Sequence, residues 1–369
     1  MTPNIDSATA ASGRAWDAGA ADKRSLTVLN VAFPFAPVGW DAVGGAEQVL
    51  SALDDGLVAA GHRSIVIAQE GSRVAGELVS IPVPSGSIDD GVRGAVHARV
   101  RRALDRALDR QRIDLVHMHG VDFDSYLPRI GVPVLVTVHL PPEWYDGGAL
   151  MPGRPATWLH GVSISQHCAF PAGAALLPPI HNGVPTERLA KRHAKRPFAL
   201  CLGRICPEKG FHIAIDAATE AGRPLLLAGA VFPYESHEGY LREQIAPRLD
   251  GDRRWIGPIG FARKRRLLSA ARCLIVPSLV PETSSLVAME SLACGTPVVA
   301  FPSGALAEII EDGRTGFLVK DVAEMADAIE AAGALDPEVC RAEARVRFPI
   351  HRMIAAYLER YHQLVGLAA

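Results

Sequence analysis

The chain has 369 residues, 49% of them hydrophobic and 21% charged, and its formal net charge is −2. This length is too great for one ordinary hydrophobic core, and with this composition it predicts a well-packed globular protein of two domains. The nearly balanced charge argues against a nucleic-acid-binding protein, which needs a basic surplus. No apolar run approaches the length of a membrane span.

Residues 1–24 contain no continuous apolar segment, so we expect a disordered tail here and not a signal peptide. The cysteines are scattered and form no CxxC pair: Cys168, Cys201, Cys206, Cys273, Cys294 and Cys340. That pattern suits a reducing cytosol and argues against a disulfide framework or a zinc site. We therefore expect a cytoplasmic protein.

The first half of the chain alternates between strand-like and helix-like segments. SLTVLNVAFPF is a β-branched apolar run, and after a glycine-rich loop VLSALDDGLVAAGH has helical spacing before the strand-like RSIVIA. Residues 92–111 place valines and leucines on one helical stripe. DLVHMH, VPVLVTVH and GVSIS are typical of short buried strands in a parallel sheet. Residues 25–190 are thus predicted to form one doubly wound α/β domain.

A basic stretch, TERLAKRHAKRP, has the composition of a linker, and the alternation restarts after it. We predict a second doubly wound domain over residues 197–345. A C-terminal amphipathic helix over residues 346–369 is expected to cross back to the first domain. The predicted fold is α/β, with two Rossmann-like domains facing each other across a cleft. Open sheets bind ligands at the carboxyl ends of their strands, so the loops there are the candidates for a site.

The segment from Gly44 to Glu47, GGAE, follows the first strand and opens the first helix. Paired glycines let the backbone approach a ligand, and a helix N-terminus offers free N–H groups. A plain strand-to-helix turn is the alternative, because this is not a GxGxxG fingerprint.

The segment from Gly203 to Gly210, GRICPEKG, follows the first strand of the second domain. Arg204 and Lys209 are two cations at a strand end. Such a pair suits the binding of a diphosphate, since each cation can form charge-assisted hydrogen bonds to the phosphate oxygens. On spacing alone, an ordinary solvated loop is an equal alternative.

In VPETSSLVAMESLACG, Glu282 precedes a predicted helix and Glu290 lies within it, between two strand-like segments. Ser284 or Ser285 could cap this helix, and Gly295 could end it. A carboxylate in apolar surroundings is costly unless it finds donors, and sugar and ribose hydroxyls are good donors. The neighbouring residues leave little polar face, which favours function over an exposed helix face.

These motifs, with DLVHMH, TVH, IHNGV and GALAEIIEDGRTGFLV, resemble family 4 of the retaining nucleotide-sugar glycosyltransferases, which have the GT-B fold. The match runs from about Leu26 to about Gln363 and is most specific in the second domain. The resemblance implies a hexosyltransferase whose second domain binds a UDP- or GDP-sugar. Its first domain would bind most of a glycan, glycolipid or small-molecule acceptor.

The resemblance also implies side-chain roles. Arg204 and Lys209 would hold the donor diphosphate. Glu282 would bind hydroxyls of the transferred sugar, and Glu290 would bind the ribose hydroxyls. His139, in TVHLPP, would sit near the anomeric carbon.

Backbone groups complete the implied donor site. Gly44 and Gly45 would close over the phosphates from the other domain. Phosphate or sugar oxygens would be bound by the first amides of the predicted helix, those of Ser284, Ser285, Leu286 and Val287. The family often has Phe-Gly where Ser284 and Ser285 stand.

Breaking a sugar–phosphate bond places negative charge on the leaving diphosphate, and fixed cations and helix-end N–H groups stabilise that charge most in the transition state. No acidic pair of the DxD type is evident in the loops that carry the motifs, so we expect neither a metal nor another cofactor. A leaving phosphate oxygen on the same face as the incoming hydroxyl could accept its proton. A double displacement through a side-chain nucleophile is the alternative.

Two basic segments, residues 99–112 and 261–266, could contact anionic lipid or a lipid-linked acceptor at the inner face of the membrane, although a solvated helix face is favoured. His117 and His119 alternate along a strand and are expected to face opposite ways, which would make them a poor metal pair.

The alternatives are a nucleotide-sugar epimerase, a phosphorylase or an inverting transferase of the same fold, and a non-catalytic nucleotide-sugar-binding protein. Secreted binding proteins need a signal peptide, which the sequence does not show. The lack of GxGxxG disfavours an NAD oxidoreductase. Donor base, sugar, acceptor and oligomeric state stay open.

Overall fold

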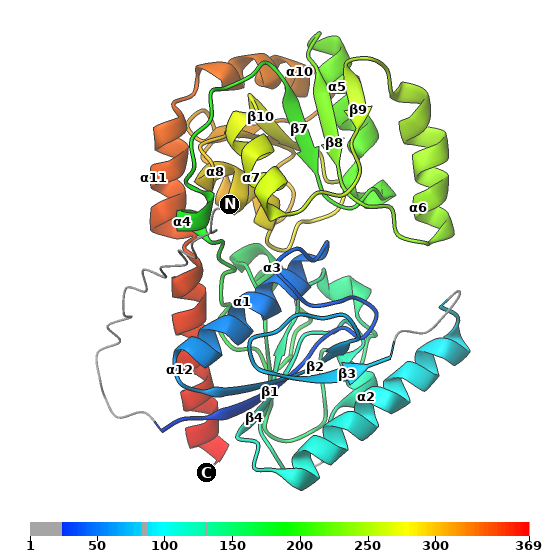
Figure 1. Ribbon diagram of the computed structural model, residues 1–369, viewed down its shortest axis with the longest axis vertical. Helices are drawn as coiled ribbons and strands as arrows, with labels where there is room; N and C mark the ends of the chain where they lie inside the picture. Colours follow the sequence, from blue (N-terminus) through cyan, green and yellow to red (C-terminus); the bar gives the residue numbers. More distant parts are fainter. Residues whose placement is uncertain (1–23, 83–87, 130, 369) are drawn as a thin grey trace, which may run out of the picture.

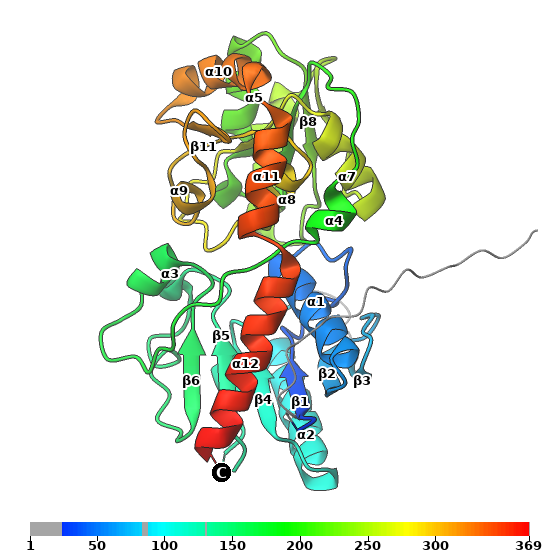
Figure 2. The same ribbon diagram turned by 90° about the vertical axis from the view of Figure 1, so that its left-hand side faces the viewer.

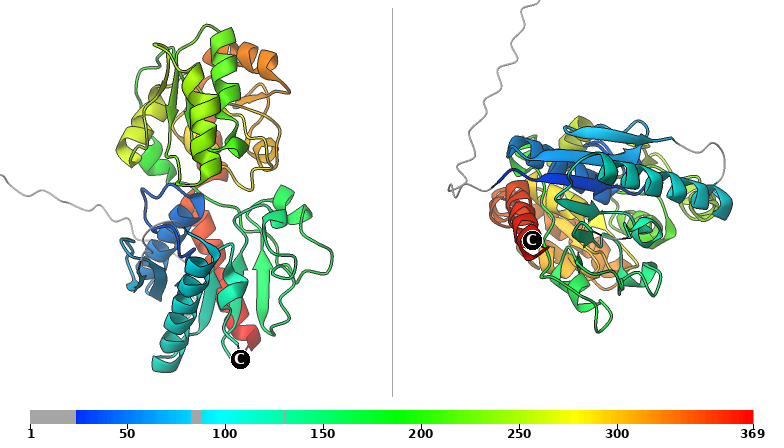
Figure 3. Two further views of the ribbon diagram at one scale, coloured as in Figure 1. Left: turned by 90° about the vertical axis from the view of Figure 1, so that its right-hand side faces the viewer. Right: turned by 90° about the horizontal axis from the view of Figure 1, so that it is seen from below.

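The computed structural model describes residues 24–82, 88–129 and 131–368, which form two α/β lobes, one above the other (Figure 1). Figure 3 shows the same arrangement from two further directions. The predicted tail lies outside the described residues except for Arg24. Each lobe is built on a parallel six-stranded sheet, which confirms the predicted fold class.

The N-terminal sheet has the strand order β3-β2-β1-β4-β5-β6, in which every neighbouring pair is parallel. This is the order of a dinucleotide-binding fold, with its topological switch point between β1 and β4. Its strands are β1 (Thr27–Val31), β2 (Arg63–Gln69), β3 (Glu77–Ile81), β4 (Leu115–Met118), β5 (Val134–Thr137) and β6 (Thr157–His160). The central strands are mostly apolar and are buried along nearly their whole length because helices cover both faces.

The helices of this half are α1 (Gly45–Ala59), α2 (Asp90–Arg110), α3 (Ile164–Cys168) and α4 (Thr186–Leu189). The prediction of a strand at GVSIS is wrong, because the strand β6 ends just before it. Ser163 Oγ accepts a hydrogen bond from Gln166 N at 3.1 Å and so caps α3. Short α4 lies within the stretch predicted as a linker.

The C-terminal sheet repeats the same topology in the order β12-β11-β10-β7-β8-β9, again all parallel. Its strands are β7 (Ala199–Leu202), β8 (Leu225–Ala228), β9 (Arg253–Trp255), β10 (Cys273–Val276), β11 (Val298–Ala300) and β12 (Gly316–Leu318). The helices around it are α5 (Phe211–Glu220), α6 (Glu235–Tyr240), α7 (Phe261–Ala270), α8 (Leu286–Ala293), α9 (Leu306–Ile309), α10 (Val322–Ala331) and α11 (Pro337–Arg347). Irregular helical turns extend α6 to Arg248.

The last helix, α12 (Ile350–Ala368), leaves the C-terminal lobe and lies along the N-terminal lobe (Figure 2). Its buried face packs on β1 and α1 and consists of Met353, Tyr357, Tyr361 and Leu364. The two chain crossings between the lobes run side by side. Val184 N donates to Phe348 O at 2.8 Å, and Ile350 N donates to Val184 O at 3.0 Å.

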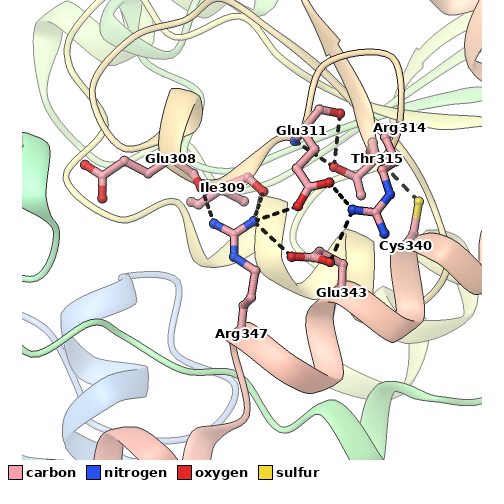
Figure 4. A network of polar contacts seen from close by, with 8 residues as sticks. All are labelled: Glu308, Ile309, Glu311, Arg314, Thr315, Cys340, Glu343 and Arg347. Carbon is pink, nitrogen blue, oxygen red and sulfur yellow. Dashed lines mark hydrogen bonds and ion pairs between the residues drawn. The ribbon is translucent and has the colours of Figure 1, made fainter.

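A polar network joins α9 to α11 (Figure 4), and one of its members also binds the other lobe. Arg347 donates to the carbonyls of Glu308 and Ile309. The Glu308 carboxylate, pointing away from Arg347, accepts from the amides of Ile164 and Ser165 at the start of α3. This carboxylate at a helix N-terminus therefore connects the lobes. No helix among the described residues is long and apolar enough to cross a bilayer.

Candidate active site

Two loops at the carboxyl edge of the C-terminal sheet lie side by side. One follows β7 (residues 203–210) and the other follows β10 (residues 277–285). Leu279 N donates to Glu208 O at 2.8 Å. Gly210 has φ +62°, and a Cβ there would overlap the carbonyl of Pro277, so only glycine allows the two loops to meet this closely.

Lys209 and Glu282 form an ion pair between these loops. Lys209 Nζ lies 2.5 Å from Glu282 Oε1, and the Ser278 hydroxyl donates to the same oxygen. The Glu282 side chain is 10% exposed and that of Lys209 is 26% exposed. Burial alone would raise the pKa of Glu282, but the charge and hydrogen bond of Lys209, together with Ser278, hold that pKa below its ordinary value. Glu282 is therefore ionised and partnered at the entrance of α8.

Helix α8 begins after Ser285, as predicted, but neither serine caps it with its side chain. Ser285 has the left-handed φ of 45°, which is costly for a residue with a Cβ. The hydroxyls of Ser284 and Ser285 are buried and have no hydrogen-bond partner among the described residues. Gly295 follows the end of the helix with φ 75°, where its N–H donates to Leu292 O at 2.9 Å.

Glu290 forms a second ion pair, inside the C-terminal lobe. Its Oε1 lies 2.6 Å from Lys264 Nζ, and both residues are buried. The other oxygen, Oε2, has no hydrogen-bond partner among the described residues. Glu290 also borders a cavity of about 10 Å³ between the lobes, together with Trp40, Phe261 and Leu286. One carboxylate oxygen is thus neutralised and the other is left for a further donor.

Lys264 belongs to the basic segment 261–266 that was weighed as a lipid contact. The structure turns this lysine inward, so it is not part of an exposed cationic surface. The other basic segment forms most of α2 at the outer edge of the N-terminal lobe (Figure 1). Four of its six arginines border an open surface cavity of about 430 Å³ next to β3: Arg99, Arg102, Arg106 and Arg110.

The GGAE segment faces α8 from the N-terminal lobe. A Cβ on Gly45 would lie 3.3 Å from Leu286 Cδ1, and a Cβ on Gly44 would overlap the carboxylate of Glu47, which folds back over the start of α1. Burial raises the pKa of Glu47, while a hydrogen bond from its own backbone N–H and the charge of Arg204 oppose that rise. Arg204 therefore acts across the cleft on a carboxylate of the opposite lobe.

Arg204 lies at the centre of this arrangement. Its guanidinium is 5.7 Å from the ring centre of Phe232. The same positive charge contributes to lowering the pKa of Glu282 and of Glu208. A cation that acts on carboxylates in both lobes is well placed to bind an anionic ligand in the cleft.

His139 follows β5 and is joined to the C-terminal lobe. Its carbonyl accepts from Thr283 Oγ1 at 2.7 Å, and its Nε2 lies 3.1 Å from Nδ1 of His119. Burial, and then the neighbouring His160, lower the pKa of His139 to about 3. At neutral pH the ring is uncharged and can act by hydrogen bonding.

The prediction that His117 and His119 face opposite ways is wrong. Their ring centres are 3.9 Å apart, because residues two apart in a strand point to the same face. A buried hydrogen-bond network connects His117, Thr137 and His160 to Tyr357 and Tyr361, the two tyrosines of α12. Its four donor–acceptor distances lie between 2.7 and 3.1 Å, as does the distance from His119 to His139. Burial lowers the pKa of His160 to about 4 and those of His117 and His119 well below the usual range.

The residues named from the sequence thus lie on segments of the two lobes that contact one another: Gly44, Gly45, His139, Arg204, Lys209, Glu282, Ser284, Ser285, Leu286, Val287 and Glu290. Their roles stay predictions. Sequence reasoning missed the involvement of Glu47, Lys264 and His119. Glu47 stands three residues after Gly44, a helix-start spacing that could have drawn attention to it. Lys264 lies in a run of cations, so its sequence context did not distinguish it from exposed basic residues. His119 was missed because its side chain was assigned to the wrong face of the strand.

Two family models match this chain. The one described as Glycosyltransferase Family 4 covers residues 43–170, and the one described as Glycosyl transferases group 1 covers residues 196–333. Together they span more than half of the chain and fall on the two lobes. The chain belongs to glycosyltransferase family 4. This confirms the resemblance and the GT-B fold, and it favours a transferase over the epimerase and binding-protein alternatives.

The relatives of this glycosyltransferase include the glycogen synthase of Mycobacterium tuberculosis, 27% identical over 390 residues, with 87% of this chain and 89% of the relative covered. Among solved structures, AviGT4, a glycosyltransferase involved in avilamycin A biosynthesis, is 25% identical with a TM-score of 0.66, covering 92% of this chain and 98% of its own. HepE of Anabaena, in complex with UDP and glucose, shares the fold with a TM-score of 0.70 at 20% identity, covering 91% and 99%.

Proposed function

We propose that this glycosyltransferase moves a hexosyl unit, with retention, from a UDP- or GDP-sugar to a hydroxyl of a glycan, glycolipid or small-molecule acceptor, without a metal ion. The observation that carries the proposal is the convergence of Lys209, Glu282 and the start of α8 at one cleft edge, opposite Gly45. The similar HepE was solved with UDP and glucose, which makes a UDP-sugar the first donor to test.

The diphosphate would lie between Arg204, Lys209 and the start of α8. An ammonium group has three N–H donors, so Lys209 can keep its bond to Glu282 and still donate to a phosphate oxygen. The N–H groups at the start of α8 have no partner within the helix and carry a partial positive charge. The buried hydroxyls of Ser284 and Ser285, for which the described part of the chain provides no hydrogen-bond partner, offer further donors.

The ribose would donate to Glu290. Lys264 already binds Oε1, and Oε2, which no described residue contacts with a hydrogen bond, suits a hydroxyl donor. The cavity beside Glu290 holds about 10 Å³, room for about one water, which is far too little for a ribose. We infer that the lobes separate to admit the donor and that Gly45 then closes toward it.

In the reaction, the bond between the anomeric carbon and the phosphate oxygen breaks, and its electron pair stays on the diphosphate. Arg204, Lys209 and the α8 amides would stabilise that charge as it develops. The acceptor hydroxyl oxygen bonds to the anomeric carbon on the face that the diphosphate leaves. Its proton passes to a leaving phosphate oxygen, and the configuration is retained. Neutral His139 would orient a sugar hydroxyl, since it carries no charge to contribute.

A panel of UDP-, GDP- and ADP-sugars, scored by thermal shift and by slow hydrolysis, tests the donor. The true donor is expected to stabilise the protein by about 2.7 kcal/mol at a hundredfold excess over its dissociation constant. Its hydrolysis product should retain the anomeric configuration. An inverted product, or no stabilisation by any nucleotide sugar, would contradict the proposal.

Metal independence has its own test. Transfer should continue in excess EDTA, because Arg204 and Lys209 supply the positive charge that a metal would otherwise bring. Loss of activity in EDTA, with recovery on adding magnesium or manganese, would show instead that a cation completes the diphosphate site.

A further inference from the structure

Three side chains with metal-binding atoms gather beside the diphosphate loop, on the side of α6. Cys206 and Glu208 belong to the loop after β7, and His237 belongs to α6. The sulfur of Cys206, a carboxylate oxygen of Glu208 and a ring nitrogen of His237 all lie within 4.8 Å of one another. Cys206 and His237 are buried, with 1% and 7% of their surface exposed.

Two polar atoms of this cluster are buried without a hydrogen-bond partner among the described residues, Glu208 Oε2 and His237 Nδ1. A buried polar atom without a partner destabilises the fold unless a ligand satisfies it. The rings of Phe232 and Tyr234 lie against the imidazole, at centre distances of 6.2 and 5.1 Å, and limit its rotation. The cluster is therefore oriented, mostly enclosed and incompletely bonded.

The donor set suits one class of ion. A thiolate, an imidazole and a carboxylate together are typical ligands of zinc, whereas magnesium and calcium prefer a shell of oxygens. Ligand atoms around a tetrahedral zinc ion lie roughly 3.5 Å apart, so three atoms within 4.8 Å can close on an ion by small side-chain movements. The thiolate and carboxylate charges would balance a divalent cation beside Arg204.

We propose that Cys206, Glu208 and His237 bind one divalent ion of the zinc class, with a fourth position left for water. The Cys206 thiol releases its proton to solvent as the ion binds. The bound ion would tie the diphosphate loop to α6 and stabilise that part of the C-terminal lobe. It takes no part in transfer, so this site is independent of the function proposed above.

The spacing of the cysteines argued against a zinc site, because they form no CxxC pair. Closely spaced cysteines indicate only those zinc sites in which two ligands share one short loop. Here the third ligand comes from α6, about thirty residues after the first two, and only the fold brings it near.

Cobalt titration of tag-free, chelator-treated protein tests the site. We expect one equivalent of Co²⁺ to give a thiolate-to-cobalt absorption in the near ultraviolet and the intense visible bands of four-coordinate cobalt, both lost when Zn²⁺ is added. Cys206→Ser should abolish the thiolate band, and His237→Gln should weaken binding at least about a hundredfold, since even residues behind the ligands contribute tenfold to a hundredfold. Zinc should also raise the melting temperature of the unmodified protein.

Cys168→Ser is the matched control, because Cys168 is the exposed cysteine and would account for adventitious thiolate binding. This variant should keep the spectrum unchanged. A spectrum that survives Cys206→Ser, or one that disappears with Cys168→Ser, would overturn the proposal. Circular dichroism and nucleoside diphosphate binding verify that each variant is folded. A negative result for the metal site would leave the proposed donor-binding residues unaffected.

Discussion

The two faces of the cleft carry buried polar groups of different kinds. The C-terminal lobe holds ions in pairs, Lys209 with Glu282 and Lys264 with Glu290. The N-terminal lobe holds four imidazoles that burial keeps neutral, those of His117, His119, His139 and His160. Paired charge is thus concentrated on the lobe expected to meet the diphosphate, whereas the opposite lobe offers mainly uncharged hydrogen-bonding groups beside the carboxylate of Glu47.

The proposed ligands would account for this difference. A leaving diphosphate needs fixed positive charge, and free carboxylates near it would repel it. Each lysine partner prevents that repulsion while leaving part of its carboxylate available for hydroxyls. A neutral acceptor needs no such compensation, and charged histidines would add desolvation costs and gain little.

The largest expected effect is that of acidification, which should lower the stability of the N-terminal lobe before that of the C-terminal lobe. A histidine that is neutral when folded but protonated when unfolded lowers the stability as pH falls below the unfolded pKa of 6.5, by about 1.4 kcal/mol per pH unit. Four such groups predict a loss of roughly 5 kcal/mol between about pH 7.5 and 5.5 in the N-terminal lobe. The pKa of Glu282 lies below its usual value, so its contribution is present above 4.5 and is lost only as pH falls further.

Calorimetric unfolding at about pH 7.5 and 5.5 measures this effect. His139→Gln should reduce the pH dependence by about one quarter, since one of four such groups is removed. His193→Gln, which changes an exposed histidine, should leave it as it is. If both variants keep the full dependence, the imidazoles are not the neutral groups described here.

Lys209→Ala should have the next largest effect, on turnover. Loss of one preorganised charge at a developing anion costs about 10²–10³ in rate, or about 2.7–4 kcal/mol. The loss of stability should be smaller, because the lysine is partly exposed and Glu282 keeps the Ser278 hydroxyl. Steady-state transfer assays measure the turnover, and thermal unfolding of the same preparation measures the stability.

Lys320→Ala provides the control, since it removes an exposed lysine of the same lobe. It should change neither the rate nor the stability by a measurable amount. A Lys209→Ala variant that transfers at a near-normal rate would remove this lysine from the mechanism.

Glu290→Gln should weaken the binding of free nucleoside diphosphate. The change keeps the shape of the side chain but replaces a charged hydrogen bond to ribose, which contributes about 1.5–3 kcal/mol. Calorimetric titration with UDP and GDP measures it.

Glu290→Gln also leaves Lys264 buried without its carboxylate, so a general loss of stability could imitate a binding defect. The double variant Glu290→Gln with Lys264→Met removes both charges and should recover stability. Its nucleotide affinity should stay low. Recovery of affinity together with stability would show that Glu290 acts only by holding the fold.

The sequence was sufficient for the architecture and for the residues that motifs fix. Alternating apolar runs predicted both sheets. A glycine-flanked loop at a strand end predicted where Arg204 and Lys209 would lie, and a predicted helix start did so for Glu282. GVSIS was mistaken for a strand because Ser163 caps a short helix there, a local hydrogen bond that an apolar pattern does not reveal.

Pairings between distant segments could not be predicted in the same way. Lys264 precedes its partner Glu290 by 26 residues, and only the packing of α7 on α8 joins them. The same is true of the contact between His117 and Tyr361, which depends on α12 returning to the other lobe. Charge balance within the site is therefore a property of tertiary structure, whereas the positions of its main residues are local.

The smallest expected effect is that of Glu282→Gln on nucleoside diphosphate binding, and it completes the comparison between the two pairs. Glu282 precedes α8 and would face the sugar, whereas Glu290 lies within α8 and would face the ribose. A nucleoside diphosphate carries no sugar, so it should bind the Glu282→Gln variant with nearly unchanged affinity. The change could even favour binding slightly, because Glu282 holds Lys209 at 2.5 Å in the free protein and a neutral amide competes less with phosphate for that lysine.

Sugar transfer by the Glu282→Gln variant should nevertheless slow, or its sugar selectivity weaken, because a charged hydrogen-bond acceptor that contributes about 1.5–3 kcal/mol is lost at the sugar hydroxyls. Calorimetry with UDP and transfer assays with the intact donor measure the two quantities separately. If Glu282→Gln weakens nucleoside diphosphate binding as much as Glu290→Gln does, the two carboxylates do not divide sugar and ribose between them.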